Sequence, residues 1–156
     1  MTLEQFVAEW NGKKNNFDGV YENQCVDIVK QYVQDVLNLP IWSGEPRYYG
    51  SIADKRFFEF HANTPLYIPR AGSIAIWNGN VGRGFGHVGI VTSANLLKFV
   101  SFDQNWPELS PCILVNHTYQ SVTGFLYPRG MDILSQYNAL VSEINSLQAK
   151  YRVLSA

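Results

Sequence analysis

Residues 73–92, SIAIWNGNVGRGFGHVGIVT, decide the fold because they hold two strand patterns on either side of a glycine-rich turn. Ser73–Trp77 and His87–Thr92 are short apolar runs, and the turn between them contains four glycines. The same pattern predicts three further strands, at residues 97–102, 113–119 and 123–127. Successive strands joined by short turns favour an antiparallel meander.

Helical patterns precede this sheet. Residues 2–10 are expected to form a short helix, and a longer amphipathic helix is expected over Gln24–Asn38, after a polar stretch at residues 11–23. Residues 40–70 are rich in proline and predict irregular structure with one short helix near Ile52–Phe60. Helices followed by an antiparallel sheet predict an α+β domain over residues 1–130.

Length and composition limit the class of protein. A chain of 156 residues with 46% hydrophobic and 16% charged residues is expected to build one ordinary core. A formal charge of −1 gives no reason to expect nucleic acid or an anionic membrane as a partner. No apolar run is long enough to span a bilayer. The first residues, MTLEQFVAEWNG, do not match a secretory signal, so the protein is expected to stay in the cytosol or to leave by another route.

The tail, residues 131–156, forms a separate element. Its apolar residues recur at alternating spacings of four and three, which indicates a coiled-coil seam of just over three heptads. The tail is expected either to pack back on the domain or lead into a linker, or to mediate self-association or docking onto another chain. The seam consists of Ile133, Tyr137, Leu140, Ile144, Leu147, Tyr151 and Leu154.

Two cysteines lie in different settings. Cys112 follows a proline and precedes a strand pattern, where it is expected to be a small buried hydrophobe. Cys25 falls in the first turn of the longer helix, where unpaired N–H groups and the helix dipole stabilise a thiolate. Such a cysteine is primed for nucleophilic attack, although a cysteine on a helix also serves as a buried small residue.

His87 opens a strand directly after the glycine-rich turn, which places its side chain at a sheet edge. Gly89 lies on the same face of that strand and is expected to leave room for the start of a helix. The other histidines, His61 and His117, lack this setting and are interpreted as surface or strand residues.

Asp103 and Asn105 end the next strand and, being two residues apart, point to the same face. Either side chain is suited to accept the imidazole N–H and hold the ring for proton transfer. The alternative is a polar turn at the end of the strand, where Asp and Asn are common.

The chain resembles the CHAP family, which comprises cysteine- and histidine-dependent amidohydrolases and peptidases of papain-like fold that cleave peptidoglycan. The resemblance covers roughly residues 1–130 and implies Cys25 as nucleophile and His87 as base. It also implies Asp103 and Asn105 as the polar partners that orient the base. Many members carry Glu at the position of Asp103, so the shorter Asp side chain leaves it open whether Asp103 or Asn105 holds the imidazole. The resemblance is carried by Asn23-Gln-Cys-Val-Asp27, Ala71-Gly-Ser-Ile-Ala-Ile-Trp77, Gly86-His-Val-Gly-Ile-Val91, Phe102-Asp-Gln-Asn-Trp106 and Gly124-Phe-Leu-Tyr-Pro-Arg129.

The loop before the cysteine has nearly the ligand spacing of an EF-hand, with oxygen donors suited to Ca²⁺ and not to zinc. Some CHAP lysins are similar and bind calcium at this place, so a structural Ca²⁺ ion is expected. The alternative is a solvated polar loop in which Asp27 serves the helix dipole. The expected ligands are Asn16, Asp18, Val20, Glu22 and Asp27.

The nucleophile and base predict amide hydrolysis through a thioester. The resemblance implies that the amide belongs to peptidoglycan and that the protein is a bacteriophage lysin or virion-associated enzyme. Tyr21 is expected to assist backbone N–H groups in holding the oxyanion. Trp77 and Trp106 either line a groove for the stem peptide or belong to the core. The rival hypotheses are a calcium-dependent wall-binding or assembly module without turnover, and a cytosolic thiol hydrolase acting on another amide.

Overall fold

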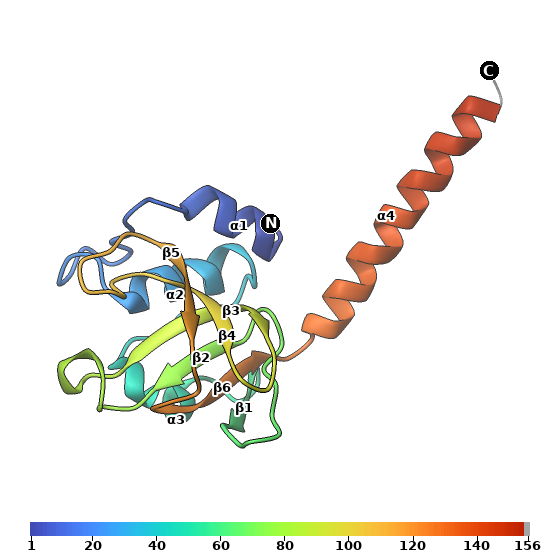
Figure 1. Ribbon diagram of the computed structural model, residues 1–156. Helices are drawn as coiled ribbons and strands as arrows, with labels where there is room; N and C mark the ends of the chain where they lie inside the picture. The colour runs from blue at the N-terminus through green and yellow to red at the C-terminus, as the bar shows by residue number, and fades with distance from the viewer. Residues whose placement is uncertain (155–156) are drawn as a thin grey trace.

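The computed structural model describes residues 1–154 and has an α+β architecture, which confirms the fold class expected from the sequence (Figure 1). Three helices, α1 (Leu3–Trp10), α2 (Cys25–Asp35) and the one-turn α3 (Tyr49–Ile52), come before the strands. A fourth helix, α4 (Met131–Leu154), follows them. The strands are β1 (Phe58–Ala62), β2 (Ile74–Trp77), β3 (His87–Ala94), β4 (Phe99–Asp103), β5 (Ile113–His117) and β6 (Val122–Pro128).

The six strands form one antiparallel sheet in the order β1-β6-β2-β3-β4-β5. Strands β2 and β3 form the hairpin expected from residues 73–92, and in it Trp77 pairs with His87. Gly86, which precedes β3, has a φ of 81° and no room for a Cβ atom, because that atom would lie 2.4 Å from the carbonyl oxygen of Trp77. Only glycine fits this close turn, and it delivers His87 to the start of the strand.

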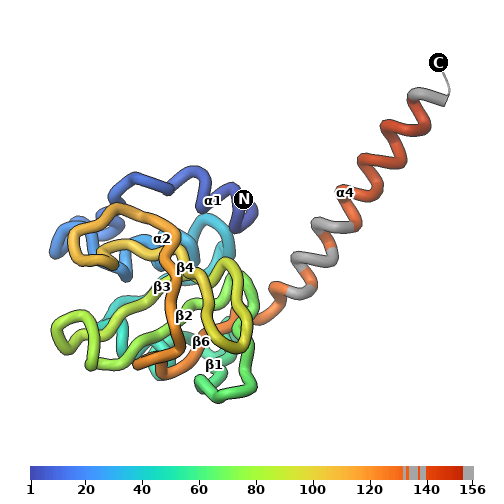
Figure 2. The backbone as a smooth tube through the Cα atoms, in the orientation of Figure 1, coloured from blue at the N-terminus to red at the C-terminus, as the bar shows by residue number. Residues whose placement is uncertain are grey.

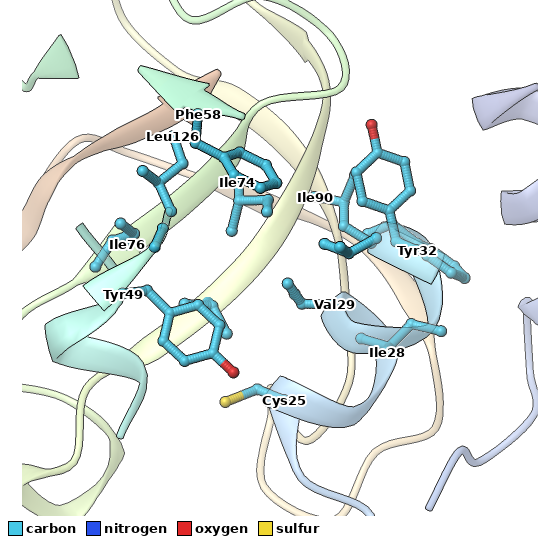
Figure 3. Close-up of a cluster of buried hydrophobic side chains, with 14 of the residues drawn as sticks. Cys25, Ile28, Val29, Tyr32, Tyr49, Phe58, Ile74, Ile76, Ile90 and Leu126 are labelled. Atoms are coloured by element: carbon cyan, nitrogen blue, oxygen red, sulfur yellow. The ribbon is translucent and has the colours of Figure 1, made fainter. Parts of the chain in front are cut away.

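The sheet buries apolar side chains on both faces. Ile74, Ile76, Val88 and Ile90 pack against α1 and α2 in the main core, part of which is shown in Figure 3. Side chains alternate between the faces of a strand, so the neighbouring residues form a second cluster on the other face. That cluster contains Ala75, Trp77, Val91, Phe99, Val122 and Phe125.

One expected element is wrong. The short helix expected near Ile52–Phe60 is replaced by α3, which ends at Ile52, and by strand β1, which begins at Phe58. Strand β1 lies at the edge of the sheet beside β6, and its exposed residues do not alternate regularly with buried ones. The sequence of β1, FEFHA, nevertheless alternates apolar and polar residues, so the local pattern fits a strand better than the helix that was expected.

Helix α4 extends away from the domain in Figures 1 and 2. Its seam is exposed, so within the described residues α4 does not pack back on the sheet. The last two residues of the expected tail, Ser155 and Ala156, lie outside the described residues. No helix within residues 1–154 is long and apolar enough to cross a membrane. The exposed seam residues are Ile133, Tyr137, Leu140, Ile144, Leu147 and Tyr151.

Candidate active site

Cys25 is the first residue of α2, with Gln24 as the residue that caps the helix. The Gln24 N–H donates to Asp27 Oδ2 at 2.8 Å, which closes the first turn. The thiol therefore lies at the positive end of the helix dipole, and the side chain of Cys25 is 7% exposed. Cys25 is not in a disulfide, so its sulfur is available for reaction at the start of the helix.

His87 is buried and interacts with Cys25. Burial alone would lower the pKa of His87, but the charge of Cys25, together with hydrogen bonds to Asp103 and Cys25, raises it to about 10. A raised pKa means that the imidazole binds a proton strongly, as a base beside a thiol must. The structure thus brings together the two residues expected to act as base and nucleophile.

Asp103 ends β4 and is fully buried. Its Oδ2 atom lies 3.2 Å from His87 Nε2 and 2.7 Å from His117 Nε2. Burial would raise the pKa of Asp103, but the hydrogen bonds from His117 and His87 hold it below its ordinary value. An ionised carboxylate only accepts hydrogen bonds, so His87 Nε2 carries a hydrogen and Nδ1 is the ring nitrogen left for Cys25.

Asn105 does not contact the imidazole. Its Nδ2 atom donates to Gln24 Oε1 at 3.4 Å, and its Oδ1 atom accepts from the Leu109 N–H at 2.6 Å. Asn105 has a φ of 61°, a left-handed conformation that asparagine tolerates well. The geometry therefore distinguishes the two expected partners, because Asp103 contacts His87 and Asn105 shapes the turn after β4.

Of two further expectations about this sheet edge, the one for His117 agrees with the structure and the one for Gly89 is wrong. His117, interpreted as a surface or strand residue, is a strand residue but is buried against Asp103. Its position was visible in the sequence, because strand alternation puts it on the face shared by Ile113 and Val115. The space beside Gly89 is taken by Asp103 and Ser101, and not by the start of a helix.

Gln104 was not expected to matter, yet its amide connects the two halves of the site. Its Nε2 atom donates to the carbonyl oxygens of Asn15 and Gln24, both at 2.8 Å. Its Oε1 atom accepts from the Asn15 N–H at 2.6 Å and from Cys112 Sγ at 3.2 Å. Because Gln24 caps α2, this side chain fixes the nucleophile's helix against the strand that carries Asp103.

The two tryptophans differ in exposure. Trp77 is 2% exposed and its ring packs against His87, with centroids 5.1 Å apart, and against His117, at 4.8 Å. This placement leaves Trp77 almost no surface for a stem peptide and makes it a support for the histidines. Trp106 is half-buried, stacks on Trp77 and lies 4.9 Å from the His87 ring, so it borders the site.

Two tyrosines approach the nucleophile in different ways. Tyr21 is 84% exposed in a left-handed turn, and its carbonyl oxygen accepts a hydrogen bond from the Gln24 side chain. Tyr49 of α3, which sequence reasoning missed, is 1% exposed, and its hydroxyl has no hydrogen-bond partner in the described structure. Figure 3 shows this hydroxyl facing the Cys25 sulfur. Burial, followed by the charge of Cys25, raises the pKa of Tyr49.

The expected calcium loop places two carboxylates near one another. The charge of Asp18 and, above all, burial raise the pKa of Asp27, and Asp27 Oδ1 is buried without a hydrogen-bond partner in residues 1–154. A buried, unpartnered carboxylate oxygen fits a cation site. Lys30, one turn after Asp27, is buried and its Nζ lies 2.5 Å from Asp18 Oδ2.

The other three expected ligands, Asn16, Val20 and Glu22, lie on the exposed outer part of the same loop. Asp18 Oδ1 accepts from the Val20 N–H at 3.0 Å, which tightens the turn. Within the described residues, no group of three or more His, Cys, Asp or Glu side chains converges as a metal site. Any cation here would therefore need amide and carbonyl oxygens besides the two carboxylates, as calcium loops use.

Comparison with known proteins links this site to a family. The family model described as "CHAP domain" matches residues 13–105, which include Cys25, His87 and Asp103. The chain is 27% identical over 145 residues to endolysin PlyTW of Staphylococcus phage Twort, covering 81% of this chain and 30% of that protein. It is 31% identical over 96 residues to endolysin LysK of Staphylococcus phage K, covering 57% and 18%. The chain thus spans less than a third of these relatives.

Solved structures agree with the fold. A crystal structure of the wild-type endolysin LysIME-EF1 superposes with a TM-score of 0.68 at 28% identity, covering 82% of this chain and 64% of that one. Ly7917, in a crystal structure with "the hydrolyzing product of MDP", superposes with a TM-score of 0.63 at 16% identity. That second match covers 79% of this chain and 60% of the other, and it bears on the fold alone.

Proposed function

This chain belongs to the CHAP domain family, and we propose that it hydrolyses an amide bond in the peptide part of bacterial peptidoglycan, as a phage endolysin does. The observation that carries the proposal is the contact between Cys25, at the start of α2, and His87, which is held in turn by Asp103. A nucleophile, a base and an orienting carboxylate in one chain of contacts are the parts that acyl transfer requires.

The reaction begins when His87 Nδ1 takes the proton of the Cys25 thiol. The thiolate attacks the carbonyl carbon of the substrate amide and forms a C–S bond. The imidazolium then protonates the leaving nitrogen, the C–N bond breaks, and a thioester remains on Cys25. His87 next removes a proton from water, which attacks the thioester carbon. The C–S bond then breaks, the imidazolium returns its proton to the Cys25 sulfur, and the carboxylic acid product loses its own proton to solvent. Asp103 stabilises the imidazolium in both halves of the cycle.

The oxyanion of each tetrahedral intermediate needs hydrogen-bond donors near Cys25. The backbone N–H groups of Cys25 and Val26 would serve this role, because N–H groups in the first turn of a helix have no carbonyl partner within it. The Tyr49 hydroxyl adds a second donor, since it is buried, unpartnered within the described structure and faces the sulfur. We therefore assign to Tyr49 the assisting role expected of Tyr21, which is left to contact substrate from the exposed loop.

Peptidoglycan is the substrate that the family supports, and the stem peptide would lie between Trp106 and the loop that carries Tyr21. The scissile bond is either the muramoyl–alanine amide or a link within the stem or cross-bridge. The protein would be made in the cytoplasm of a host bacterium and act on its wall, or be carried in a virion.

The test is digestion of purified sacculi with the wild-type chain and with Cys25→Ala. We expect the wild type to lower the turbidity of the suspension and release new amino termini, and Cys25→Ala to do neither. Mass spectrometry of the released fragments identifies the bond. If both proteins clear sacculi equally, or if both bind sacculi without releasing amino termini, the hydrolase proposal is wrong, and the second outcome supports a wall-binding module.

We also propose that the loop before α2 binds Ca²⁺ through Asn16, Asp18, Val20, Glu22 and Asp27, with Asp27 Oδ1 as the buried ligand. The ion would fix the loop to the first turn of α2, two residues from Cys25, and thus order the nucleophile's surroundings. Lys30 already places a positive charge against Asp18. The cation and the Lys30 ammonium group would therefore compete for the same carboxylates.

Helix α4 is proposed to associate with a second copy of itself. In an antiparallel pair, Ile144 would contact Leu147 of the other copy and Leu140 would contact Tyr151, so the exposed seam covers itself. Glu143 and Lys150 flank the seam seven residues apart and would face one another across the same pair. Complementary charge beside a complementary apolar stripe favours a symmetric dimer.

A further inference from the structure

A second histidine completes the buried charge network of the active site. Asp103 Oδ2 lies closer to His117 Nε2, at 2.7 Å, than to His87 Nε2, at 3.2 Å. All three side chains are buried. We propose that His117 is a positioning residue of the hydrolase, which acts on the proposed base through Asp103 without touching substrate.

The carboxylate of Asp103 is confined on both sides. Its Oδ1 atom lies so close to strand β3 that a Cβ atom on Gly89 would be only 2.0 Å away, and it has no hydrogen-bond partner in the described structure. Its Oδ2 atom receives both imidazoles. With one oxygen against a backbone and the other between two donors, the carboxylate has a single orientation, and His117 supplies the shorter of the two bonds that define it.

The hydrogen bond to Asp103 is the main polar interaction of His117, because aromatic rings surround the rest of its side chain. Strand β5 pairs with β4, and His117 stands opposite Phe99. Its ring stacks on Phe99 with centroids 5.5 Å apart and packs edge-on against Trp77 of β2 and Trp106, at 4.8 and 5.6 Å. The titratable groups that face it are Asp103 on β4 and, across that carboxylate, His87 on β3.

The chemical consequence follows from burial. A carboxyl group in this apolar enclosure tends to be neutral, and a neutral Asp103 could donate its own hydrogen to His87 and select the wrong tautomer. The N–H of His117 opposes that tendency, since its hydrogen bond lowers the pKa of Asp103. An ionised Asp103 then accepts from His87 Nε2 and leaves Nδ1 free to receive the Cys25 proton.

The experiment follows Cys25 reactivity in the full chain, because this measurement does not depend on peptidoglycan hydrolysis. The rate of alkylation by iodoacetamide is measured against pH for the wild type, His117→Leu and His117→Gln, with Cys25→Ala as background. Cys112 contributes little, because burial raises the pKa of its thiol to about 12. Turnover of a soluble peptidoglycan fragment is measured in parallel.

We expect His117→Leu to move the acid limb of the alkylation profile to higher pH and to lower kcat by about tenfold with little change in KM, in the range found for groups that orient a reacting side chain. Glutamine can place an N–H near the position of Nε2, so His117→Gln should restore most of both quantities. The proposal is wrong if the pH profile of alkylation in His117→Leu matches that of the wild type. It is also wrong if both variants lose kcat equally and in proportion to the fall in their melting temperatures.

A measurement on the wild type keeps the inference testable if His117→Leu does not fold. Imidazole ¹⁵N chemical shifts identify which ring nitrogen carries the hydrogen. We expect His117 to carry it on Nε2. A His117 ring with hydrogen on Nδ1 alone would refute the role. The inference rests on the proposed function, but an alkylation profile that shifts in a chain without hydrolytic activity would reject the hydrolase while retaining the link from His117 to Cys25.

Discussion

Gly89 and Asp103 are in direct contact across strands β3 and β4, and the contact exists because residue 89 has no side chain. A Cβ atom there would lie 2.0 Å from Asp103 Oδ1 and 3.1 Å from Ser101 Oγ. Gly89→Ala should therefore push the carboxylate away from His87 and lower hydrolysis of sacculi by about 100-fold, as displacement of a positioned group does. The extra methyl group should also lower the free energy of unfolding by about 1–3 kcal/mol.

Gly124→Ala is the matched control for that variant. A Cβ atom at Gly124 would lie 2.5 Å from the His61 carbonyl oxygen and from Phe60, between strands β1 and β6 and away from the site. It should destabilise the sheet to a similar extent while leaving the pH profile of activity unchanged. If the two variants are equally stable and lose the same amount of activity, the contact of Gly89 with Asp103 has no specific role.

Replacing Asp103 by Asn should change how stability depends on pH. The pKa of Asp103 is lowered in the folded state, so its ionised form stabilises the protein above the unfolded value of about 3.9, and this contribution is lost as pH falls through the folded value. Urea unfolding at a series of pH values should therefore show that the free energy of unfolding falls less between pH 7 and pH 3 in Asp103→Asn than in the wild type. Asn105→Ala should keep the wild-type pH dependence, and a wild-type curve for Asp103→Asn would contradict the assignment.

Removing the Tyr49 hydroxyl should separate activity from stability. The hydroxyl is buried without a partner in the described structure, so Tyr49→Phe should leave the melting temperature unchanged or raise it. Turnover should fall by about 100-fold, the usual loss of one oxyanion donor. The neighbouring exposed Tyr48 provides the control, since Tyr48→Phe should alter neither quantity. Full activity in Tyr49→Phe would remove this residue from the mechanism.

The competition between Lys30 and Ca²⁺ can be measured by thermal unfolding with and without the ion. Lys30→Met removes the ammonium group beside Asp18, so the variant should melt at a lower temperature in chelator. It should also gain more from Ca²⁺ than the wild type, by about 3–6 °C at saturating ion. Lys14→Met, at an exposed lysine in the same segment, should behave as the wild type. Melting that does not respond to Ca²⁺ in any variant would exclude the metal site.

The α4 seam predicts a dimer in sedimentation experiments on the full chain. Ile144→Asp and Leu147→Asp place charges in the apolar seam and should each give a monomer at concentrations where the wild type sediments as a dimer. Ser142→Asp, also exposed on the helix, should remain dimeric. A monomeric wild type at all concentrations up to about 100 µM would refute self-association, since it would leave less than about 5.5 kcal/mol for binding between two helices.

Local patterns predicted the parts of the site that depend on one element. Cys25 was recognisable because the amphipathic periodicity of α2 begins there, and His87 because the turn before β3 requires glycine at residue 86. The choice between Asp103 and Asn105 was not predictable, because both lie at the end of the same strand pattern and only their tertiary contacts differ.

The residues that were missed act across long distances in the sequence. His117 meets Asp103 only because β5 pairs with β4, and Tyr49 reaches Cys25 from a single helical turn without periodicity. Trp77 could be assigned to core or groove only once the rings of His87 and His117 were seen to cover it. Such roles are decided by tertiary contacts, which a periodic pattern does not encode.

The hydrogen bonds of the Gln104 amide bear on the order in which the site forms during synthesis on the ribosome. It joins the start of α2 to a residue 80 positions later in the chain, and His87 and Asp103 are likewise synthesised long after Cys25. If these residues activate Cys25 as proposed, activation requires that almost the whole domain has been translated and has folded. Unfinished chains would then carry a cysteine without its proposed base and orienting carboxylate.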